Sequence, residues 1–244
     1  MPRQLPSAPC GFAGRARELA ALNGGRGHRN GRQSGCDDHC DRGRRGIGKT
    51  WLALRWAHDH LDCFPDGQFY VDLSGFDPVD EPVPAERAVR GFLGALGVAP
   101  TSVPLEPDGQ AARYRTLTAG RRLLVVLDNA RDTEHVVPLL SGGSSYSVLI
   151  TSRHELGGLI TTHGGTTLPL RTLDEPQARE LLAHKLGEAR LAEEPDAAQQ
   201  IVRQCGGISL ALAIVGAGGS PARPAAVDAG RRTVGKPAGC PRHR

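Results

Sequence analysis

The chain has 244 residues, of which 39% are hydrophobic, 4% aromatic and 23% charged. A chain of this length folds as one domain, or as one domain with a smaller lobe. It has no run of about 18 apolar residues, so we expect no transmembrane helix. The first six residues lack the apolar stretch of a secretory signal. We therefore expect a cytoplasmic protein whose six cysteines are free thiols.

The net charge of +4 is unevenly distributed along the chain. Residues 1–46 and 217–244 each carry a net charge of +5, whereas residues 47–216 carry −6. A protein that binds nucleic acid gathers its basic side chains on a folded face. Here the positive charge lies largely in two segments, 24–45 and 217–244, whose composition predicts an aberrant or disordered chain. We therefore expect no direct contact with nucleic acid.

The first half of the chain alternates between helical and strand patterns. Residues 11–22 are expected to form a loop that enters a helix. Apolar residues recur at helical spacing in three further segments, 50–61, 84–96 and 111–117, and the run 69–73 is typical of a strand.

A continuous apolar run follows at 123–127, and two further strands are expected at 147–153 and, shorter, at 167–170. Such a run is typical of a strand that is buried on both faces of a parallel sheet. Between the segments 123–127 and 147–153, residues 135–140 predict a short helical turn. Strands that alternate with helices predict an α/β fold with a doubly wound parallel sheet.

From residue 173 onward the pattern is helical throughout. Asp174 is a plausible N-cap with Pro176 in the first turn, and Gly206 and Gly207 end a second helix over 195–205. We predict four segments: a tail (1–10), a P-loop nucleotide-binding domain (11–172), a helical lobe (173–216) and a disordered tail (217–244).

The run 43–50, Gly-Arg-Arg-Gly-Ile-Gly-Lys-Thr, fits the P-loop pattern G-x-x-x-x-G-K-[ST]. Its glycines allow backbone N–H groups to face phosphates, and Lys49 would reach the β- and γ-phosphates. The hydroxyl of Thr50 would be a ligand of Mg²⁺, together with the carboxylate of Asp128 at the end of the run 123–127. Arg153, at the end of the next expected strand, could reach a γ-phosphate.

The order of these motifs resembles an NB-ARC domain of the STAND class of P-loop NTPases, as found in bacterial SARP-type transcriptional regulators. Motifs at 12–19, 46–50, 69–73, 125–131, 151–153 and 206–212 carry the resemblance. It implies an ADP/ATP-dependent switch with Mg²⁺ that self-associates in its ATP state within a longer protein. It also implies that Arg15 lies near the nucleotide, that Arg153 is a sensor, and that residues 207–210 pack on the adenine side. The predicted nucleotide-binding residues are Arg15, Gly43, Gly46, Ile47, Gly48, Lys49, Thr50, Trp51, Asp128, Arg153, Ser209 and Leu210.

Two positions depart from the family pattern. Ser209 stands where the family has a proline, and Asn129 stands where a second acid would assist hydrolysis. An amide cannot accept a proton from water, so we expect hydrolysis to be slow at most.

The segment before Lys49 lacks the buried strand from which a P-loop hangs. Residues 36–41 are Cys-Asp-Asp-His-Cys-Asp, and the codons for these residues, read one base later, encode Ala, Val, Thr, Ile or Met. We therefore predict a displaced reading frame near 24–45 and, from the same kind of composition, after 217.

Three other interpretations remain open at this stage. The chain could be a slow ATPase, or a degraded copy of a longer regulator without function. It could also be a zinc or nucleic-acid module that uses His28, Cys36, His39 and Cys40, although this spacing is uncommon for zinc and adjacent ligands strain a tetrahedral site.

Overall fold

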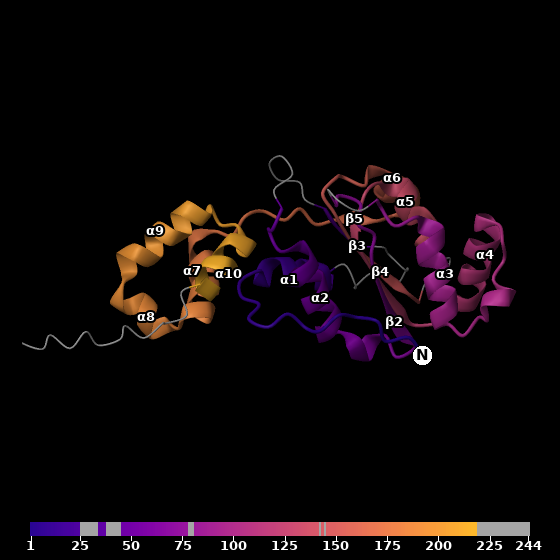
Figure 1. Ribbon diagram of the computed structural model, residues 1–244, viewed down its shortest axis with the longest axis horizontal. Helices are drawn as coiled ribbons and strands as arrows, with labels where there is room; N and C mark the ends of the chain where they lie inside the picture. Colours follow the sequence, from indigo (N-terminus) through magenta and orange to yellow (C-terminus); the bar gives the residue numbers. More distant parts are fainter. Residues whose placement is uncertain (25–33, 38–44, 78–80, 142, 144, 219–244) are drawn as a thin grey trace, which may run out of the picture.

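The computed structural model describes residues 1–24, 34–37, 45–77, 81–141, 143 and 145–218. Within them, a parallel sheet is covered by helices on both faces, and a group of helices follows at the carboxyl side of the chain (Figure 1). The strands are β1 (Ser34–Asp37), β2 (Gly67–Asp72), β3 (Leu123–Ala130), β4 (Ser147–Ser152) and β5 (Thr166–Thr167).

The sheet has the strand order β2-β3-β4-β1-β5, and all of its neighbouring pairs are parallel. Asp72, the last residue of β2, pairs in register with Asp128 of β3. Ser152, the last residue of β4, pairs with Ala130 after a register irregularity in β3. The carboxyl ends of these strands therefore bring polar residues to one edge of the sheet, where ligands bind in open α/β folds.

Strand β3 explains why two layers of helices are needed. Its apolar side chains alternate between two separate clusters and are fully buried in both. Leu123, Val125 and Leu127 pack with α3 (Ala85–Ala95) and α4 (Pro107–Thr118), whereas Leu124 and Val126 pack with α2 (Lys49–Asp59). A strand with apolar side chains on both faces, as in the first five residues of β3, is stable only where both faces of the sheet are covered.

Shorter elements complete this part of the structure. They are α1 (Ala16–Gly24), η2 (Leu61–Cys63), η3 (Pro100–Ser102), α5 (Thr133–Val136), η4 (Val137–Leu139) and α6 (Gly157–His163). In Figure 1, α1 and α2 lie between the carboxyl-terminal helices and the rest of the sheet domain.

The helical lobe consists of α7 (Glu175–Leu186), α8 (Glu188–Glu193), α9 (Pro195–Cys205) and α10 (Ser209–Gly218). It has its own apolar cluster, which includes Leu182, Leu191 and Leu212. The predicted start of α7 is confirmed, because Asp174 and Gln177 form a capping box. Between α9 and α10, Gly207 accepts a backbone hydrogen bond of 2.8 Å from Leu173.

The prediction that no strand precedes the P-loop is wrong. Residues 34–37 form β1, which pairs with Leu149–Ser152 of β4 and with β5. The physical reason is that ladder hydrogen bonds use backbone groups, so a polar sequence does not prevent pairing at a position that the topology requires. The rest of the segment 24–45, apart from Gly24 and Arg45, lies outside the described residues.

The predicted disordered tail also begins too early, because α10 continues through Gly218. Residues 219–244 lie outside the described part of the chain. None of the helices in the described ranges has the length and apolar character that a membrane span requires.

Candidate functional site

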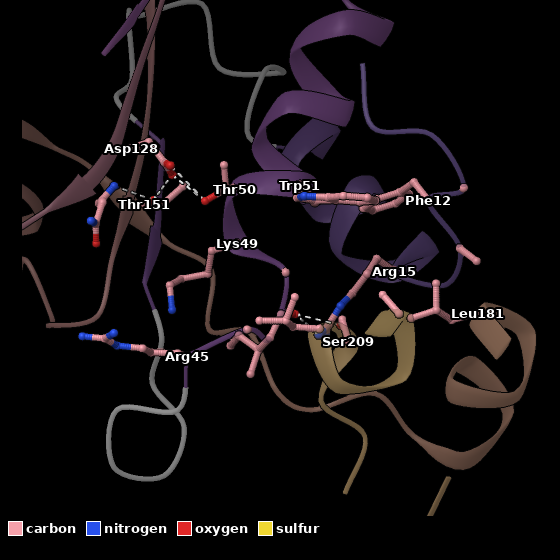
Figure 2. A pocket seen from close by; sticks show the side chains of 18 of the residues that line it. Phe12, Arg15, Arg45, Lys49, Thr50, Trp51, Asp128, Thr151, Leu181 and Ser209 are labelled. Atoms are coloured by element: carbon pink, nitrogen blue, oxygen red, sulfur yellow. Dashed lines mark hydrogen bonds between the residues drawn. The ribbon is translucent and has the colours of Figure 1, made fainter. Parts of the chain in front are cut away.

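A cavity of about 450 Å³ lies at the carboxyl edge of the sheet, between the P-loop and the helical lobe. This volume is within the range of small-molecule sites. Figure 2 shows polar and charged side chains at one end, among them Lys49, Thr50 and Asp128, and the rings of Phe12 and Trp51 at the other. The predicted residues that line it are Arg15, Gly46, Ile47, Gly48, Lys49, Thr50, Trp51, Asp128, Arg153, Ser209 and Leu210.

The structure therefore brings together all of the predicted site residues except Gly43, which lies outside the described residues. Within the loop, Gly46 and Gly48 have φ angles of 86° and 97°, which glycine adopts without strain. Gly48 is the N-cap of α2, so Lys49 and Thr50 begin that helix. The N–H groups of a helix N-terminus favour anions at this place.

Asp128 is the centre of a hydroxyl cluster at the polar end. Both of its carboxylate oxygens accept hydrogen bonds of 2.9 Å from Oγ1 of Thr50. Thr151 at the end of β4 also donates to Oδ1, and the hydroxyl of Tyr70 donates to Oδ2 at 3.3 Å. Mg²⁺ prefers oxygen ligands such as carboxylates and hydroxyls. The Asp128 carboxylate and the Thr50 hydroxyl, which lie next to each other, therefore fit a magnesium ion.

Burial sets the electrostatics of this cluster. Asp128 is only 5% exposed, and this burial raises its pKa, while the bonds from Thr151 and Thr50 act in the opposite direction. Burial and the charge of Asp128 raise the pKa of the Tyr70 phenol as well, so Tyr70 remains a donor at neutral pH. An ionised Asp128 is therefore costly here unless a cation approaches it.

Arg15 lines the cavity, but its guanidinium makes structural bonds. It is 3% exposed and has a left-handed φ angle of 63°. It donates at 2.8 Å to the backbone carbonyl of Ile47 and at 2.8 Å to Glu18. Arg15 thus fixes the P-loop backbone from the side of α1.

The helical lobe contacts the same loop through the first residues of α10. The hydroxyl of Ser209 donates to the Ile47 carbonyl at 3.1 Å, and the N–H of Leu210 donates to the Gly46 carbonyl at 2.9 Å. A Cβ atom added to Gly46 would lie 2.7 Å from Cβ of Leu210. This close approach explains why a glycine is required at position 46.

Sequence reasoning missed several lining residues. Thr151 and Asp72 could have been found, because they end or nearly end strands next to Asp128 at the same sheet edge. Arg45, Leu181 and Lys185 carry no such signal, because their place depends on how the loop and the lobe pack.

Asn129 has a left-handed φ angle of 58°, and its N–H donates to Thr151 at 2.9 Å. Its backbone therefore helps to orient the Asp128 cluster.

Within the described ranges, no group of His, Cys, Asp and Glu could hold a metal ion by protein ligands alone, and Cys10, Cys63 and Cys205 are free thiols. Three of the four residues of the zinc interpretation, His28, His39 and Cys40, lie outside those ranges.

Two regulatory proteins of Streptomyces are similar to this chain in sequence. No protein-family model matches the chain. The regulatory protein AfsR of Streptomyces coelicolor is 38% identical over 218 residues, and AfsR of Streptomyces griseus is 36% identical over 214. Each alignment covers 87% of this chain but 21% of the relative, so the chain spans about a fifth of their length.

Solved structures agree with the fold. A signal transduction ATPase with numerous domains (STAND), carrying a tetratricopeptide repeat sensor, from Pyrococcus horikoshii superposes with a TM-score of 0.55 and 19% identity, over 86% of this chain and 30% of that one. The chain has the fold of the P-loop NTPases and is homologous to part of AfsR. The ORC1 protein of Aeropyrum pernix, solved in complex with DNA, superposes with a TM-score of 0.52 and 17% identity, over 86% of this chain and 60% of that one.

The motifs, the AfsR homology and the STAND fold together support an NB-ARC or STAND-like domain. The homologous relatives are named regulatory proteins, and this chain matches about a fifth of their length.

Proposed function

We propose that the chain is an ADP/ATP-binding switch module of a bacterial signalling or transcriptional regulator. The observation that carries this proposal is the meeting of the P-loop, the Asp128 cluster and the helical lobe at one cavity. AfsR is named a regulatory protein, and the STAND relative is named a signal transduction ATPase.

The polar end of the cavity suits the phosphates. Lys49 supplies a cation, and the α2 N-terminus supplies backbone N–H donors at Gly48 and beyond. Thr50 and Asp128 would hold Mg²⁺, which would supply positive charge to neutralise the phosphates. Neutralising the buried Asp128 carboxylate would also remove the cost of its ionisation.

The apolar end suits a base. Phe12, Trp51 and Leu181 line it, and Trp51 is 44% exposed, which is unusual for so large a ring. Aromatic faces stack with bases without needing a particular hydrogen-bond pattern. Lys185, whose Nζ lies 5.9 Å from the centre of the Trp51 ring, adds a donor beside this surface.

Switching requires that the two lobes sense the nucleotide together. Ile47 meets this requirement, because its backbone carbonyl in the P-loop accepts hydrogen bonds both from Arg15, next to α1, and from Ser209 of the helical lobe. A change of loop conformation on nucleotide exchange would strain one bond or the other and shift the helical lobe. In a longer protein, that movement would be transmitted to further domains and to self-association.

Hydrolysis is expected to be slow. Asp128 is committed to Thr50 and Thr151, and Asn129 follows it with an amide in place of an acid. A slow cycle suits a switch, because the bound nucleotide then defines the state of the protein for a long time.

Analysis of bound nucleotide tests this proposal. We expect protein purified without added nucleotide, then denatured, to release ADP or ATP in near-stoichiometric amount, detectable by chromatography. We also expect the nucleotide-depleted protein to bind ADP and ATP in calorimetric titrations with Mg²⁺. Absence of both release and binding in a folded sample would contradict the proposal.

A further inference from the structure

Arg45 stands immediately before Gly46 and is a cavity-lining cation that the motif pattern does not specify. Figure 2 shows its side chain on the same side of the cavity as Lys49, away from the rings of Phe12 and Trp51. Arg153, which follows β4, also lines the cavity. The polar end therefore has two guanidinium groups in addition to the P-loop lysine.

Both guanidinium groups are anchored on a single residue. Nη2 of Arg45 donates a hydrogen bond of 3.0 Å to the backbone carbonyl of Phe76. The Cζ atom of Arg153 lies 4.9 Å from the centre of the Phe76 ring, within the range of a cation–π contact. His154 packs edge-on against the same ring, with centroids 4.6 Å apart. Phe76 thus holds the two arginines close to each other.

The two like charges act on each other. Partial burial and the neighbouring Arg45 lower the pKa of Arg153, and Asp77 offsets this in part. Other acids near the polar end are committed: Asp72 accepts a bond of 2.8 Å from the Ser74 N–H, and Asp128 serves the hydroxyl cluster. An anionic group between the two guanidiniums would attract each of them and so offset their mutual repulsion.

We infer that Arg45 is a further specificity-determining residue, which adds a second guanidinium beside Arg153, the sensor that the resemblance implies, and so raises the preference of the cavity for a nucleoside triphosphate over the diphosphate. This inference rests on the proposed function, because it concerns the same cavity. The diphosphate needs only the loop N–H groups and Lys49. The additional phosphate needs further donors, and a guanidinium fork offers two parallel hydrogen bonds to phosphate oxygens.

The test compares the affinities of wild type, Arg45→Gln, Arg153→Gln and the double variant for ADP and for a non-hydrolysable β,γ-imido analogue of ATP, by calorimetry with Mg²⁺. The matched control is Arg87→Gln, which removes the same charge from an exposed position of α3, remote from the cavity lining. Arg45 is itself exposed, so its replacement should leave the melting temperature unchanged.

We expect Arg45→Gln to weaken binding of the triphosphate analogue about tenfold, as for loss of one charged hydrogen-bonding partner, and ADP less than twofold. The double variant should lose less than the product of the two single effects, because both side chains serve one phosphate. Arg87→Gln should bind both nucleotides as the wild type does.

Equal weakening of ADP and the analogue by Arg45→Gln, or no weakening of either, would overturn the inference and leave the proposed function intact. A wild type that binds neither nucleotide would overturn both.

Discussion

The hydroxyl of Ser209 donates a hydrogen bond of 3.1 Å to the backbone carbonyl of Ile47, so the first residue of α10 is joined to the loop that precedes α2. Arg15 donates to the same carbonyl at 2.8 Å. These two donors come from segments that are far apart in the sequence, and they share one acceptor. Together with the bond from the Leu210 N–H to the Gly46 carbonyl, this shared acceptor couples the P-loop conformation to the position of the helical lobe.

Ser209→Ala should weaken this coupling. The carbonyl keeps its bond from Arg15, so we expect a loss of about 0.5–1.5 kcal/mol in the free energy of unfolding, typical of one hydrogen bond. Urea denaturation of nucleotide-depleted protein measures it. Ser209→Thr keeps the hydroxyl and should lie between the wild type and the alanine variant. An alanine variant as stable as the wild type would show that the bond contributes nothing.

Gly46→Ala should separate the lobe from the loop. The φ angle of 86° disfavours alanine, and the new Cβ would lie 2.7 Å from Cβ of Leu210. Gly97 is a matched control, because its φ angle is 88° and nothing lies within 4 Å of its added Cβ. Both variants lose about 1–2 kcal/mol to backbone strain, and we expect Gly46→Ala to lose about 1–3 kcal/mol more from the contact. Equal losses in urea denaturation would contradict the lobe contact.

Asp128→Asn should stabilise the nucleotide-free protein at neutral pH. It should also abolish the rise in melting temperature that Mg²⁺ causes in the presence of ADP. Burial raises the pKa of Asp128, so the stability that its protonated form provides is present at low pH and is lost as the pH rises through that raised pKa. The amide avoids this loss. We therefore expect the melting temperature of the variant to exceed that of the wild type by roughly 2–4 °C at pH 8, the shift for about 1 kcal/mol in a chain of this length.

The difference should shrink as the pH is lowered, because the wild-type carboxyl then becomes neutral as well. With ADP present, Mg²⁺ should raise the melting temperature of the wild type and leave that of Asp128→Asn unchanged. A variant that is less stable than the wild type at pH 8 would show that the three hydroxyl donors outweigh the burial of the charge.

The displaced-frame hypothesis makes a prediction about strand β1. This strand lies between β4 and β5, where β-branched residues are favoured. Replacing the segment 36–37, the last two residues of β1, by Val-Thr, one of its displaced readings, should therefore raise the melting temperature. Asp196→Thr, an exposed replacement of the same type in α9, is the control and should change little. A lower melting temperature for the segment variant would contradict the hypothesis.

Much of the fold could be predicted because its signals are local. The apolar run 123–127 lies in β3, the segment 147–153 corresponds to β4, and Asp174 caps α7 as expected. Strand β1 was missed because its residues carry no strand pattern, and only its neighbours place it in the sheet.

The site was predictable where a motif fixes both residue and geometry, as at Lys49, Thr50 and Asp128. The site was not predictable where the packing of distant segments decides which side chains lie together. Tyr70 reaches Asp128 only because β2 and β3 are adjacent, and Arg45 meets Arg153 only because Phe76 holds both. Such contacts join segments that are far apart in the sequence, and no local pattern encodes them.

The most direct measurement of the central claim is a calorimetric titration of Lys49→Ala with ADP and with the β,γ-imido analogue of ATP. The matched control is Arg55→Ala, which removes a positive charge from the exposed side of the same helix, where Arg55 pairs with Asp59 at 2.9 Å. We expect the control to bind as the wild type does, and Lys49→Ala to lose at least about a hundredfold in affinity for both nucleotides, as for loss of a charged phosphate contact. Unchanged binding by Lys49→Ala would contradict the assignment of this cavity as the nucleotide site.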